Sequence, residues 1–384
     1  MEISDILNHL GEDRENYSNA VSPPIYQSSN FCFKDVATMR EALKKEFDEP
    51  FYTRGYNPTV AILRKKLAAL EAAEDALVFA SGSAAVAAAI MSCVSKGDHV
   101  VSVARPYSWT DKLLNIYLER FGVECSMIDG TEIENFVEVI KENTKLIVLE
   151  SPNSLTFELQ DLEAVASLAK EKGIFTLCDN SYATPLNQQP INMGIDLVVH
   201  SASKYIGGHS DLVAGVLCGS REKIAAIMQS EYMTLGGIIS PHEAWMMIRG
   251  LRTLQLRVEK SCASTKEVVA FLETHPKIEK MMFPFSDSHP QCELAKKQMK
   301  DCGGLFSILL RAGEIEEVES FCNKLNKFLL ACSWGGHESL IFPTCALRDS
   351  KNYQQGEIPW NLVRFYIGLE EPEMLIADLK SALS

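Results

Sequence analysis

The residues best suited to chemistry in this chain lie around Lys204. The stretch 196–211 opens with an apolar run over 197–199, which is typical of a buried strand, and then turns to small hydroxyl residues, one lysine and a glycine pair. A lysine at the end of a buried strand is poorly explained by packing, because burial penalises its ammonium unless it is paired or neutralised. As a neutral amine, the same side chain would be a nucleophile able to condense with an aldehyde.

Hydroxyl groups beside this lysine could bind a phosphate. Ser201 and Ser203 flank Lys204, and the glycine pair at 207–208 leaves backbone accessible nearby. An aldehyde and a phosphate together indicate pyridoxal phosphate (PLP). A solvated lysine in a surface turn is the more ordinary interpretation of this stretch when it is taken alone.

A second possible anion site is the turn Ser81-Gly82-Ser83. It follows a short apolar strand expected over 77–80 and precedes an alanine-rich helix expected over 84–94. Free amide groups and the helix dipole both attract anions at such a helix start. The turn matches neither the dinucleotide glycine pattern nor the P-loop pattern, and most turns of this kind only cap a helix.

The elements that must position these residues alternate between strand and helix. We expect strands over 98–104, 124–128, 145–150, 174–179, 197–200 and 212–218, and helices over 109–121, 132–140 and 162–172. Repeated strand–helix units with nearly continuous apolar strands predict an α/β fold with a mostly parallel sheet and helices on both faces. Glu150, Asp179 and the group at 201–204 all fall at carboxyl ends of strands, the edge where ligands bind in such sheets.

The chain changes character after about residue 220. Helices are expected over 243–259, 264–274 and 373–383, with strands over 306–310 and 364–367. Before the large domain, a helix is expected over 59–71, and residues 1–50 are irregular apart from a short amphipathic helix at 35–47. The predicted organisation is an N-terminal arm at 1–50, a large domain at 51–245 and a smaller α+β domain at 246–384.

Arg364 is the one cation inside an otherwise apolar strand of the smaller domain. It could face water on an edge strand, or it could clamp a carboxylate, for which its planar guanidinium is well suited. No second ligand stands at metal spacing from His209, so we expect no metal.

Composition excludes several classes of protein. The net charge of −14 argues against nucleic acid and anionic membranes as main partners. The eleven cysteines lack paired spacing, the first residues do not form a signal sequence, and no apolar run is long enough to span a bilayer. We therefore expect a cytoplasmic protein with free thiols.

The residues taken together resemble the transsulfuration, or Cys/Met metabolism, family of PLP-dependent enzymes with the aspartate-aminotransferase-like fold. The resemblance runs from Pro23 to Leu379. The motifs that carry it are Tyr52-Thr-Arg54, Asn57-Pro58-Thr59, Ser81-Gly82, Glu150-Ser-Pro152, Asp179-Asn180, Ser201-Ala-Ser-Lys-Tyr205, Gly208-His-Ser-Asp211, Arg249-Gly-Leu-Arg-Thr253, Gly335-Gly-His-Glu-Ser339, Arg364 and Ile367-Gly-Leu-Glu370.

The resemblance implies roles for individual residues. Lys204 would bind the cofactor and move the Cα proton, Asp179 would pair with the pyridine nitrogen, and Tyr107 would stack on the ring and protonate a leaving sulfur. Further cofactor contacts would come from Ser81, Gly82, Ser83, Glu150, Ser201 and Ser203, and from Tyr52 and Arg54 of a neighbouring subunit in a homotetramer. Substrate contacts would come from Arg364, Ser333, Tyr52, Cys332 and Trp334.

Departures from the family pattern bear on which bond is cleaved. Ser154 stands where many members carry an asparagine, and Ser333-Trp334-Gly-Gly is similar to bacterial cystathionine β-lyases. The glutamate that γ-synthases and γ-lyases tend to carry just before the serine of this motif is replaced by Cys332. The resemblance thus implies a β-lyase that cleaves cystathionine, or cysteine S-conjugates, to a thiol, pyruvate and ammonia, with a role in methionine biosynthesis.

Two alternatives stay open. The loop Tyr52-Thr-Arg-Gly-Tyr-Asn-Pro-Thr59 is as similar to γ-acting members, such as methionine γ-lyase or cystathionine γ-synthase and γ-lyase, as to β-lyases. A non-catalytic PLP-binding homologue is the alternative from a different class. Pyruvate or 2-oxobutyrate as the product of cystathionine cleavage would separate the two chemistries.

Overall fold

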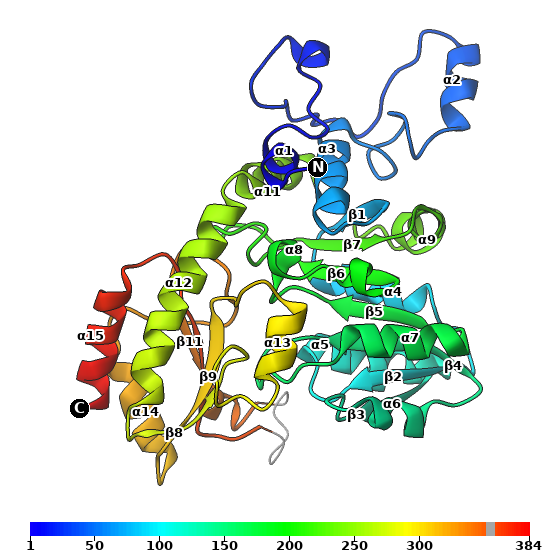
Figure 1. The fold of residues 1–384 in the computed structure, drawn as a ribbon. Helices are drawn as coiled ribbons and strands as arrows, with labels where there is room; N and C mark the ends of the chain where they lie inside the picture. The colour runs from blue at the N-terminus through cyan, green and yellow to red at the C-terminus, as the bar shows by residue number, and fades with distance from the viewer. Residues whose placement is uncertain (351–357) are drawn as a thin grey trace.

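Two β-sheets organise the chain. The computed structural model describes residues 1–350 and 358–384, with a seven-stranded sheet between residues 75 and 219 and a five-stranded sheet between 278 and 366. Figure 1 shows the two sheets and their helices as neighbouring lobes, with the long helix α12 (Leu254–Glu273) running along the second lobe. The expected α/β fold, with a large mostly parallel sheet and a smaller C-terminal sheet, is confirmed.

The larger sheet has the strand order β1-β7-β6-β5-β4-β2-β3. Strands β2 to β6 are mutually parallel, whereas β7 runs antiparallel to β6 and β1 runs antiparallel to β7. The bounds are Asp75–Phe79 for β1, His99–Val103 for β2, Glu124–Ile128 for β3, Thr144–Glu150 for β4, Phe175–Asp179 for β5, Leu197–Ser201 for β6 and Gly215–Gly219 for β7.

Helices cover both faces of this sheet, which explains why its central strands are apolar on both sides. One apolar core joins inward side chains of the sheet to α3 (Pro58–Leu70), α7 (Leu162–Lys172) and α11 (Pro241–Leu251). A second core on the other face joins the sheet to α4 (Gly82–Met91) and α9 (Arg221–Ile227).

Local signals place the starts of three of these helices. Asn57 caps α3, with Pro58 at the first helical position, and Ser81 and Asp161 cap α4 and α7 with their side-chain oxygens. Such caps satisfy backbone N–H groups that the helix itself cannot bond. Gly173 ends α7 with a φ of 65°, a conformation that glycine adopts without strain.

The smaller sheet has the order β10-β11-β12-β9-β8 and is antiparallel except between β10 and β11. Its bounds are Ile278–Met282 for β8, Leu305–Leu310 for β9, Leu329–Leu330 for β10, Leu340–Pro343 for β11 and Leu362–Tyr366 for β12. Apolar residues of α12, α14 (Ile315–Lys324) and α15 (Pro372–Leu383) join the core of this sheet. Phe306 of β9 and Phe365 of β12 stack in that core, with ring centroids 5.2 Å apart.

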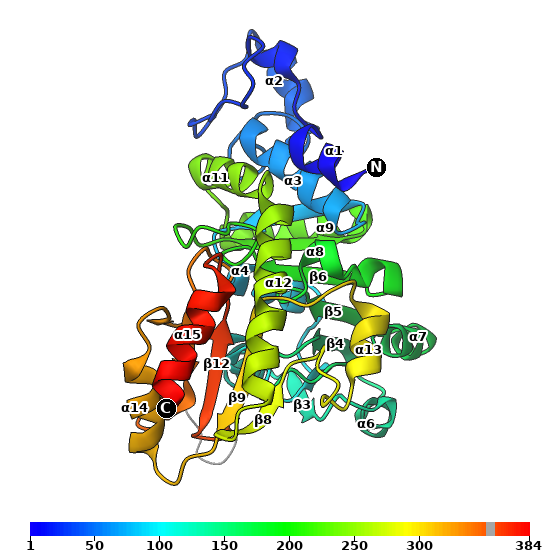
Figure 2. The same ribbon diagram turned by 60° about the vertical axis from the view of Figure 1, so that its left-hand side comes forward.

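Helices were expected at 243–259 and 264–274, and the predicted boundary between them is wrong. The first helix, α11, ends at Leu251, and α12 then continues without interruption to Glu273 (Figure 2). The Arg257 guanidinium explains the break, because it donates to the Gly250 carbonyl at 2.8 Å and to the Thr253 hydroxyl at 3.0 Å. That side chain adds a donor to a carbonyl at the end of α11, which also accepts from the N–H of Thr253 at 3.2 Å.

The helix expected over 109–121 is also divided. Residues Ser108–Lys112 form α5, a π-helical turn covers Leu113–Tyr117, and a 3-10 turn covers Glu119–Phe121. The N–H of Leu118 bonds the carbonyl of Leu113, five residues back, so the apolar face does not follow one regular helical spacing. The remaining helices are α1 Ile3–Asn8, α2 Val36–Leu43, α6 Ile133–Val139, α8 Thr184–Asn187, α10 Met233–Leu235 and α13 Cys292–Gln298.

The N-terminal segment is attached through α1, which packs against α3. In both views α2 and the loops beside it lie apart from the two sheets (Figures 1 and 2). Among the described residues, no helix is both long enough and apolar enough to cross a membrane. The domain boundaries expected at residues 50 and 245 stay predictions.

Candidate active site

Lys204 lies in the loop that follows β6, where its amine donates to the Ser333 hydroxyl at 2.5 Å. Burial and, to a smaller extent, the positive charge of Arg364 together lower its pKa to about 8. Both effects penalise the ammonium form of the side chain. An amine that gives up its proton near neutral pH is suited to bond an aldehyde and to act as a base.

The start of α4 approaches the Lys204 loop closely. A Cβ atom on Gly82 would lie 3.1 Å from the Cα of Ser201, and one on Gly215 would lie 2.1 Å from the carbonyl oxygen of Ser81. Glycine at these two positions therefore lets the helix start, β6 and β7 meet without a steric clash. The Ser81 hydroxyl already accepts from the N–H of Ala84 at 3.1 Å, so its backbone neighbours are the free donors for an anion.

The two serines beside Lys204 differ in their partners. The Ser203 hydroxyl accepts from the N–H of Ala214 at 3.0 Å, which ties the lysine loop to the residue before β7. The Ser201 N–H donates to the Ser181 hydroxyl at 2.7 Å. Ser181 thus joins the loops after β5 and β6, a role that the sequence did not indicate.

Two carboxylates lie side by side at the ends of β4 and β5, because Glu150, which is buried, and Asp179, which is half-buried, are paired in the strand register. Burial and, to a smaller extent, the negative charge of Asp179 together raise the pKa of Glu150 to about 7. Burial also raises the pKa of Asp179, while the N–H of Ser181, at 2.9 Å, opposes that shift. A protonated nitrogen against Asp179 would compensate its buried charge.

Glu150 holds two neighbouring loops in place. Its carboxylate accepts from the N–H of Tyr107 at 2.7 Å and from the N–H of Ser154 at 2.8 Å. Both bonds use backbone donors, so Glu150 fixes the position of Tyr107 whatever that side chain contacts. This scaffolding role differs from the direct cofactor contact that the sequence led us to expect.

Tyr107 lies beside the start of α4 and is 44% exposed. Burial of its hydroxyl raises its pKa, and a hydrogen bond with the Ser83 side chain acts in the opposite direction. Tyr107 and Ser83, both expected to contact the cofactor, are therefore neighbours. At neutral pH the phenol keeps its proton and can donate it.

Arg364 of β12 reaches across from the smaller sheet. Its Nη1 donates to the Ser154 carbonyl at 3.2 Å, and its guanidinium carbon lies 5.4 Å from the ring centroid of Phe342. Burial lowers its pKa to about 10, although the guanidinium remains charged near neutral pH. Within the described residues no carboxylate forms an ion pair with Arg364, which leaves this cation available for an anionic ligand.

The loop 332–335 brings the smaller sheet to Lys204. Ser333 adopts a φ of 82°, and a Cβ on Gly335 would lie 2.6 Å from the N–H nitrogen of Tyr205, so this loop packs directly on the lysine backbone. Trp334 is buried, with its ring 5.5 Å from that of Tyr205 and 5.6 Å from the Lys204 amine. Trp334 thus supports Lys204.

Cys332, in contrast, is exposed. Its thiol is close enough to influence the pKa of Lys204, of Arg364 and of Tyr107. The structure therefore brings Cys332 together with the predicted catalytic and carboxylate-binding side chains.

Tyr52 and Arg54 are the predicted site residues that this chain does not bring to its own Lys204. They stack on each other, with the Arg54 guanidinium carbon 5.4 Å from the Tyr52 ring centroid. Both are exposed, and among the described residues neither forms a hydrogen bond or ion pair with a residue of the site. They belong to the segment that leads from α2 to α3.

Arg257 is a supporting residue that the sequence did not identify. Its guanidinium donates to the Tyr205 carbonyl at 2.7 Å, and a Cβ on Gly208 would collide with it. The Tyr205 hydroxyl accepts from the N–H of Gly304 at 2.5 Å, so the residue after Lys204 is anchored at both ends. The only sequence signal was an arginine in a helix, which ordinarily faces solvent.

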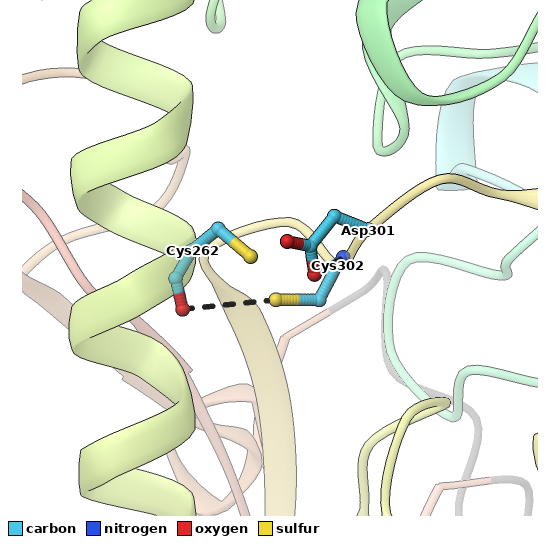
Figure 3. A group of neighbouring side chains, drawn as sticks. All are labelled: Cys262, Asp301 and Cys302. Atoms are coloured by element: carbon cyan, nitrogen blue, oxygen red, sulfur yellow. Dashed lines mark hydrogen bonds between the residues drawn. The ribbon is translucent and has the colours of Figure 1, made fainter. Parts of the chain in front are cut away.

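Outside the site, one group in the described part of the chain could hold a metal ion. The ligand atoms of Cys262, Asp301 and Cys302 all lie within 4.8 Å of one another (Figure 3). However, the Lys266 amine lies 2.7 Å from Asp301 and balances its charge, and the Cys302 thiol donates to the Cys262 carbonyl at 3.7 Å. With these partners present we assign no metal there, and the expected absence of a metal stays a prediction.

The assembled residues fit PLP. Lys204, whose pKa is lowered, would bind the aldehyde. The start of α4 and Ser201 would face the phosphate, and the Asp179 carboxylate would contact the ring nitrogen. Each of these groups carries a charge or a free donor that the cofactor would complement.

Comparisons with known proteins agree with this chemistry. The chain matches the family described as Cys/Met metabolism PLP-dependent enzyme over residues 5–384. It is 38% identical to L-methionine gamma-lyase of Treponema denticola over 98% of this chain and 95% of that protein. It is 35% identical to cystathionine beta-lyase of Lactococcus lactis subsp. cremoris, over 98% and 97%.

A solved structure of the metY protein of Campylobacter jejuni superposes with a TM-score of 0.94, at 28% identity and full coverage of both chains. That structure contains a pyridoxyl-lysine phosphate. The cofactor indicated by the residues around Lys204 is therefore PLP.

Proposed function

Because the chain belongs to the Cys/Met metabolism family of PLP-dependent enzymes, we propose that it is a carbon–sulfur lyase that acts at the γ-carbon of methionine. The reaction would convert methionine and water to 2-oxobutyrate, methanethiol and ammonia. The observation that carries the lyase assignment is the Lys204 amine, which has a pKa of about 8 and is held 2.5 Å from Ser333. Bound PLP supplies an aldehyde for the substrate amine and a ring that accepts electrons from Cα.

Lys204 is the proposed base. Its amine would take the proton from Cα, and elimination at the γ-carbon then needs a second proton to leave Cβ. The same amine could accept that second proton once it had given the first to the bound cofactor. Ser333 would hold the amine in position between these transfers. Tyr107 would donate a proton to the departing sulfur, since burial raises its pKa and keeps the phenol protonated.

Arg364 is the proposed anchor for the substrate carboxylate. It is a half-buried cation without an ion pair among the described residues, and its Nη1 already lies 3.2 Å from the Ser154 carbonyl. A carboxylate would satisfy its remaining donors in a two-pronged hydrogen-bonded pair. Fixing the carboxylate would also fix the direction of the Cα–H bond toward Lys204.

The γ-position is favoured over the β-position that the sequence motifs suggested. The loss of the glutamate before Ser333 counts against a γ-bound substrate with a distal amino group, but methionine has no such group. The exposed thiol at Cys332, in place of a carboxylate, is compatible with an uncharged methylthio end. The 38% identity to a methionine gamma-lyase, against 35% to a cystathionine beta-lyase, supports the same choice.

Cleavage of cystathionine at the β-carbon is the second candidate. It is supported by the Ser333-Trp334-Gly335-Gly336 motif, and both chemistries use the same lysine, aspartate and arginine. In β-cleavage the sulfur leaves Cβ once the Cα proton has been removed, whereas in γ-cleavage a proton must also leave Cβ before the sulfur leaves Cγ.

We also propose that the enzyme is an oligomer in which a neighbouring subunit completes the site. A surface cavity of about 390 Å³ lies beside Tyr107, lined mainly by apolar side chains of α4 and of the segment 107–117. Exposed Trp109 and Ile116 lie at this surface, and exposed Tyr52 and Arg54 have no partner in the site of their own chain. The apolar surface would favour association, and the two arm residues of one subunit would reach the phosphate side of the next. A homotetramer built from two such dimers is the expected assembly.

The product of the reaction tests the proposal. The PLP-loaded enzyme is incubated separately with methionine and with cystathionine, and the ketoacids are separated as hydrazones. Formation of 2-oxobutyrate and methanethiol from methionine supports the γ-lyase. Pyruvate from cystathionine without 2-oxobutyrate from methionine would overturn it in favour of the β-lyase, and Lys204→Ala should abolish either product.

A further inference from the structure

A buried histidine–glutamate pair lies directly behind the predicted active site. The Nε2 of His200 and the Oε2 of Glu71 are 2.7 Å apart, and their side chains are 3% and 0% exposed. Glu71 is the residue after α3, and His200 is in β6, one residue before Ser201. Because side chains alternate along a strand, His200 points to the α3 face, away from the face on which Ser201 meets α4.

This pair is the centre of a hydrogen-bonded network. The Asn180 side chain lies 3.4 Å from both carboxylate oxygens of Glu71 and donates to the Gln188 carbonyl at 2.9 Å. The Gln188 side-chain nitrogen bonds Asn180 at 3.0 Å and the Ser151 carbonyl at 2.9 Å.

The network therefore holds β4, β5 and β6 at positions next to their predicted cofactor-binding residues. Ser151 follows Glu150, Asn180 follows Asp179, and His200 precedes Ser201. The network links the ends of β4, β5 and β6, which must keep a fixed spacing for these side chains to act on one ligand. Nothing in the chemistry assigned to Lys204 uses this network directly.

The pair also affects the pKa of Asp179. Burial raises the pKa of Glu71, while His200 opposes that shift, and the charge of His200 also lowers the pKa of Asp179. The other titratable groups that face Glu71 are the thiols of Cys178 on β5 and Cys218 on β7, whose pKa values are raised well above the usual range by burial. These thiols stay neutral, so among the described residues the imidazole is the group that can balance Glu71.

We propose that Glu71 and His200 form a positioning pair that sets the spacing of Asp179 and Ser201. The proposal rests on PLP being the ligand of this site. The contacts of Glu71 with His200 and Asn180 join the ends of β6 and β5 to the end of α3. Asp179 is thereby held where its carboxylate can keep a proton on the ring nitrogen of the bound cofactor.

The test uses the absorption spectrum of bound PLP as a function of pH. The variants are Glu71→Gln, His200→Gln and the double variant, and their PLP affinity is measured by titration of the cofactor-free protein. Loss of either partner frees the ends of β5 and β6 to shift, so Asp179 should no longer be held against the cofactor ring, and the midpoint of the spectral titration should move. We expect each single variant to move the spectral midpoint by about half a pH unit or more and to weaken PLP binding, and the double variant to move the midpoint no further.

His99→Gln is the matched control. His99 is also fully buried, in β2 of the same sheet, with hydrogen bonds to Thr144 at 2.8 Å and Ser126 at 2.9 Å. This change should lower stability without moving the spectral midpoint. If His200→Gln shifts the midpoint no more than His99→Gln does, or if the two single shifts add in the double variant, the proposed pair is wrong.

Failure to fold and failure of the proposed function can be recognised separately. Glu71→Gln is nearly isosteric, and thermal unfolding of the cofactor-free variants reports their folding, so this variant decides the question alone if His200→Gln does not fold. A wild-type protein without a PLP absorption band would refute the proposed function itself. A wild-type band with an unchanged midpoint in Glu71→Gln refutes only the positioning pair.

Discussion

The amine of Lys204 and the hydroxyl of Ser333 lie 2.5 Å apart although they are separated by 129 positions in the chain. Lys204 follows β6 of the larger sheet, and Ser333 lies between β10 and β11 of the smaller one. A loop of the smaller sheet therefore decides where the lysine points. The left-handed backbone at Ser333, with a φ of 82°, brings this hydroxyl to the amine while Trp334 packs beneath it.

Replacing Ser333 by alanine should lower kcat by about tenfold or more, because a hydrogen bond to a charged or reactive amine contributes about 1.5–3 kcal/mol. The measurement is steady-state formation of the ketoacid. Ser320→Ala, the same change at an exposed position of α14, should leave kcat unchanged. Equal rates in Ser333→Ala and the wild type would show that the amine needs no such support.

Replacing Arg364 by lysine should raise KM for the amino-acid substrate by about 10- to 100-fold, because a lysine cannot make the two-pronged pair with a carboxylate. The effect on kcat should be smaller. Arg311→Lys, at an exposed position in the loop that follows β9, is the control. An unchanged KM with a large loss of kcat would mean that Arg364 acts on the reacting atoms and does not anchor the carboxylate.

The stability of the cofactor-free protein should depend on pH through Lys204. Its pKa of about 8 in the fold lies below the ordinary value of 10.5, so between these limits the unfolded chain binds a proton that the folded chain has released. Stability from this group therefore rises with pH across that window and is lost as pH falls through 8. The difference corresponds to roughly 3 kcal/mol.

Urea unfolding at pH 7 and pH 10 measures this effect. Lys204→Met should remove the Lys204 contribution, so the wild type should gain stability relative to the variant as pH rises. A constant difference between the two proteins across the window would contradict the lowered pKa.

Replacing Lys66 by methionine should lower the free energy of unfolding by about 3 kcal/mol, because it removes one partner of a buried ion pair. The Lys66 amine is fully buried, lies 3.2 Å from Glu12 and donates to the carbonyls of Ile6 and Leu7 at 3.0 and 3.1 Å. The change therefore detaches the N-terminal segment from α3. Lys65→Met, on the exposed side of the same helix, should change stability little when both are measured by urea unfolding.

Local patterns predicted much of the fold from the sequence. An apolar run of strand length predicted β4, expected at 145–150 and observed at 144–150, and the helix pattern predicted α7 at 162–172, because both depend on neighbours within a few residues. The same patterns could not divide α11 from α12, since the break depends on a bond from Arg257 to Gly250 that closes only when the helices are packed. They also could not predict that β7 runs antiparallel to both of its neighbours, β1 and β6, because strand direction depends on the path of the chain between the strands.

The sequence by itself determined the chemistry of the site: a lysine, an acid and a small-residue turn at strand ends, with an arginine in a later strand. Those assignments follow from residue type and from the shared edge of a parallel sheet. Only the tertiary structure decided that Ser333 meets Lys204, that Glu150 holds the Tyr107 backbone, and that Glu71 pairs with His200. These contacts join residues far apart in the chain, and burial, which shifts their pKa values, exists only after the two sheets and their helices have packed.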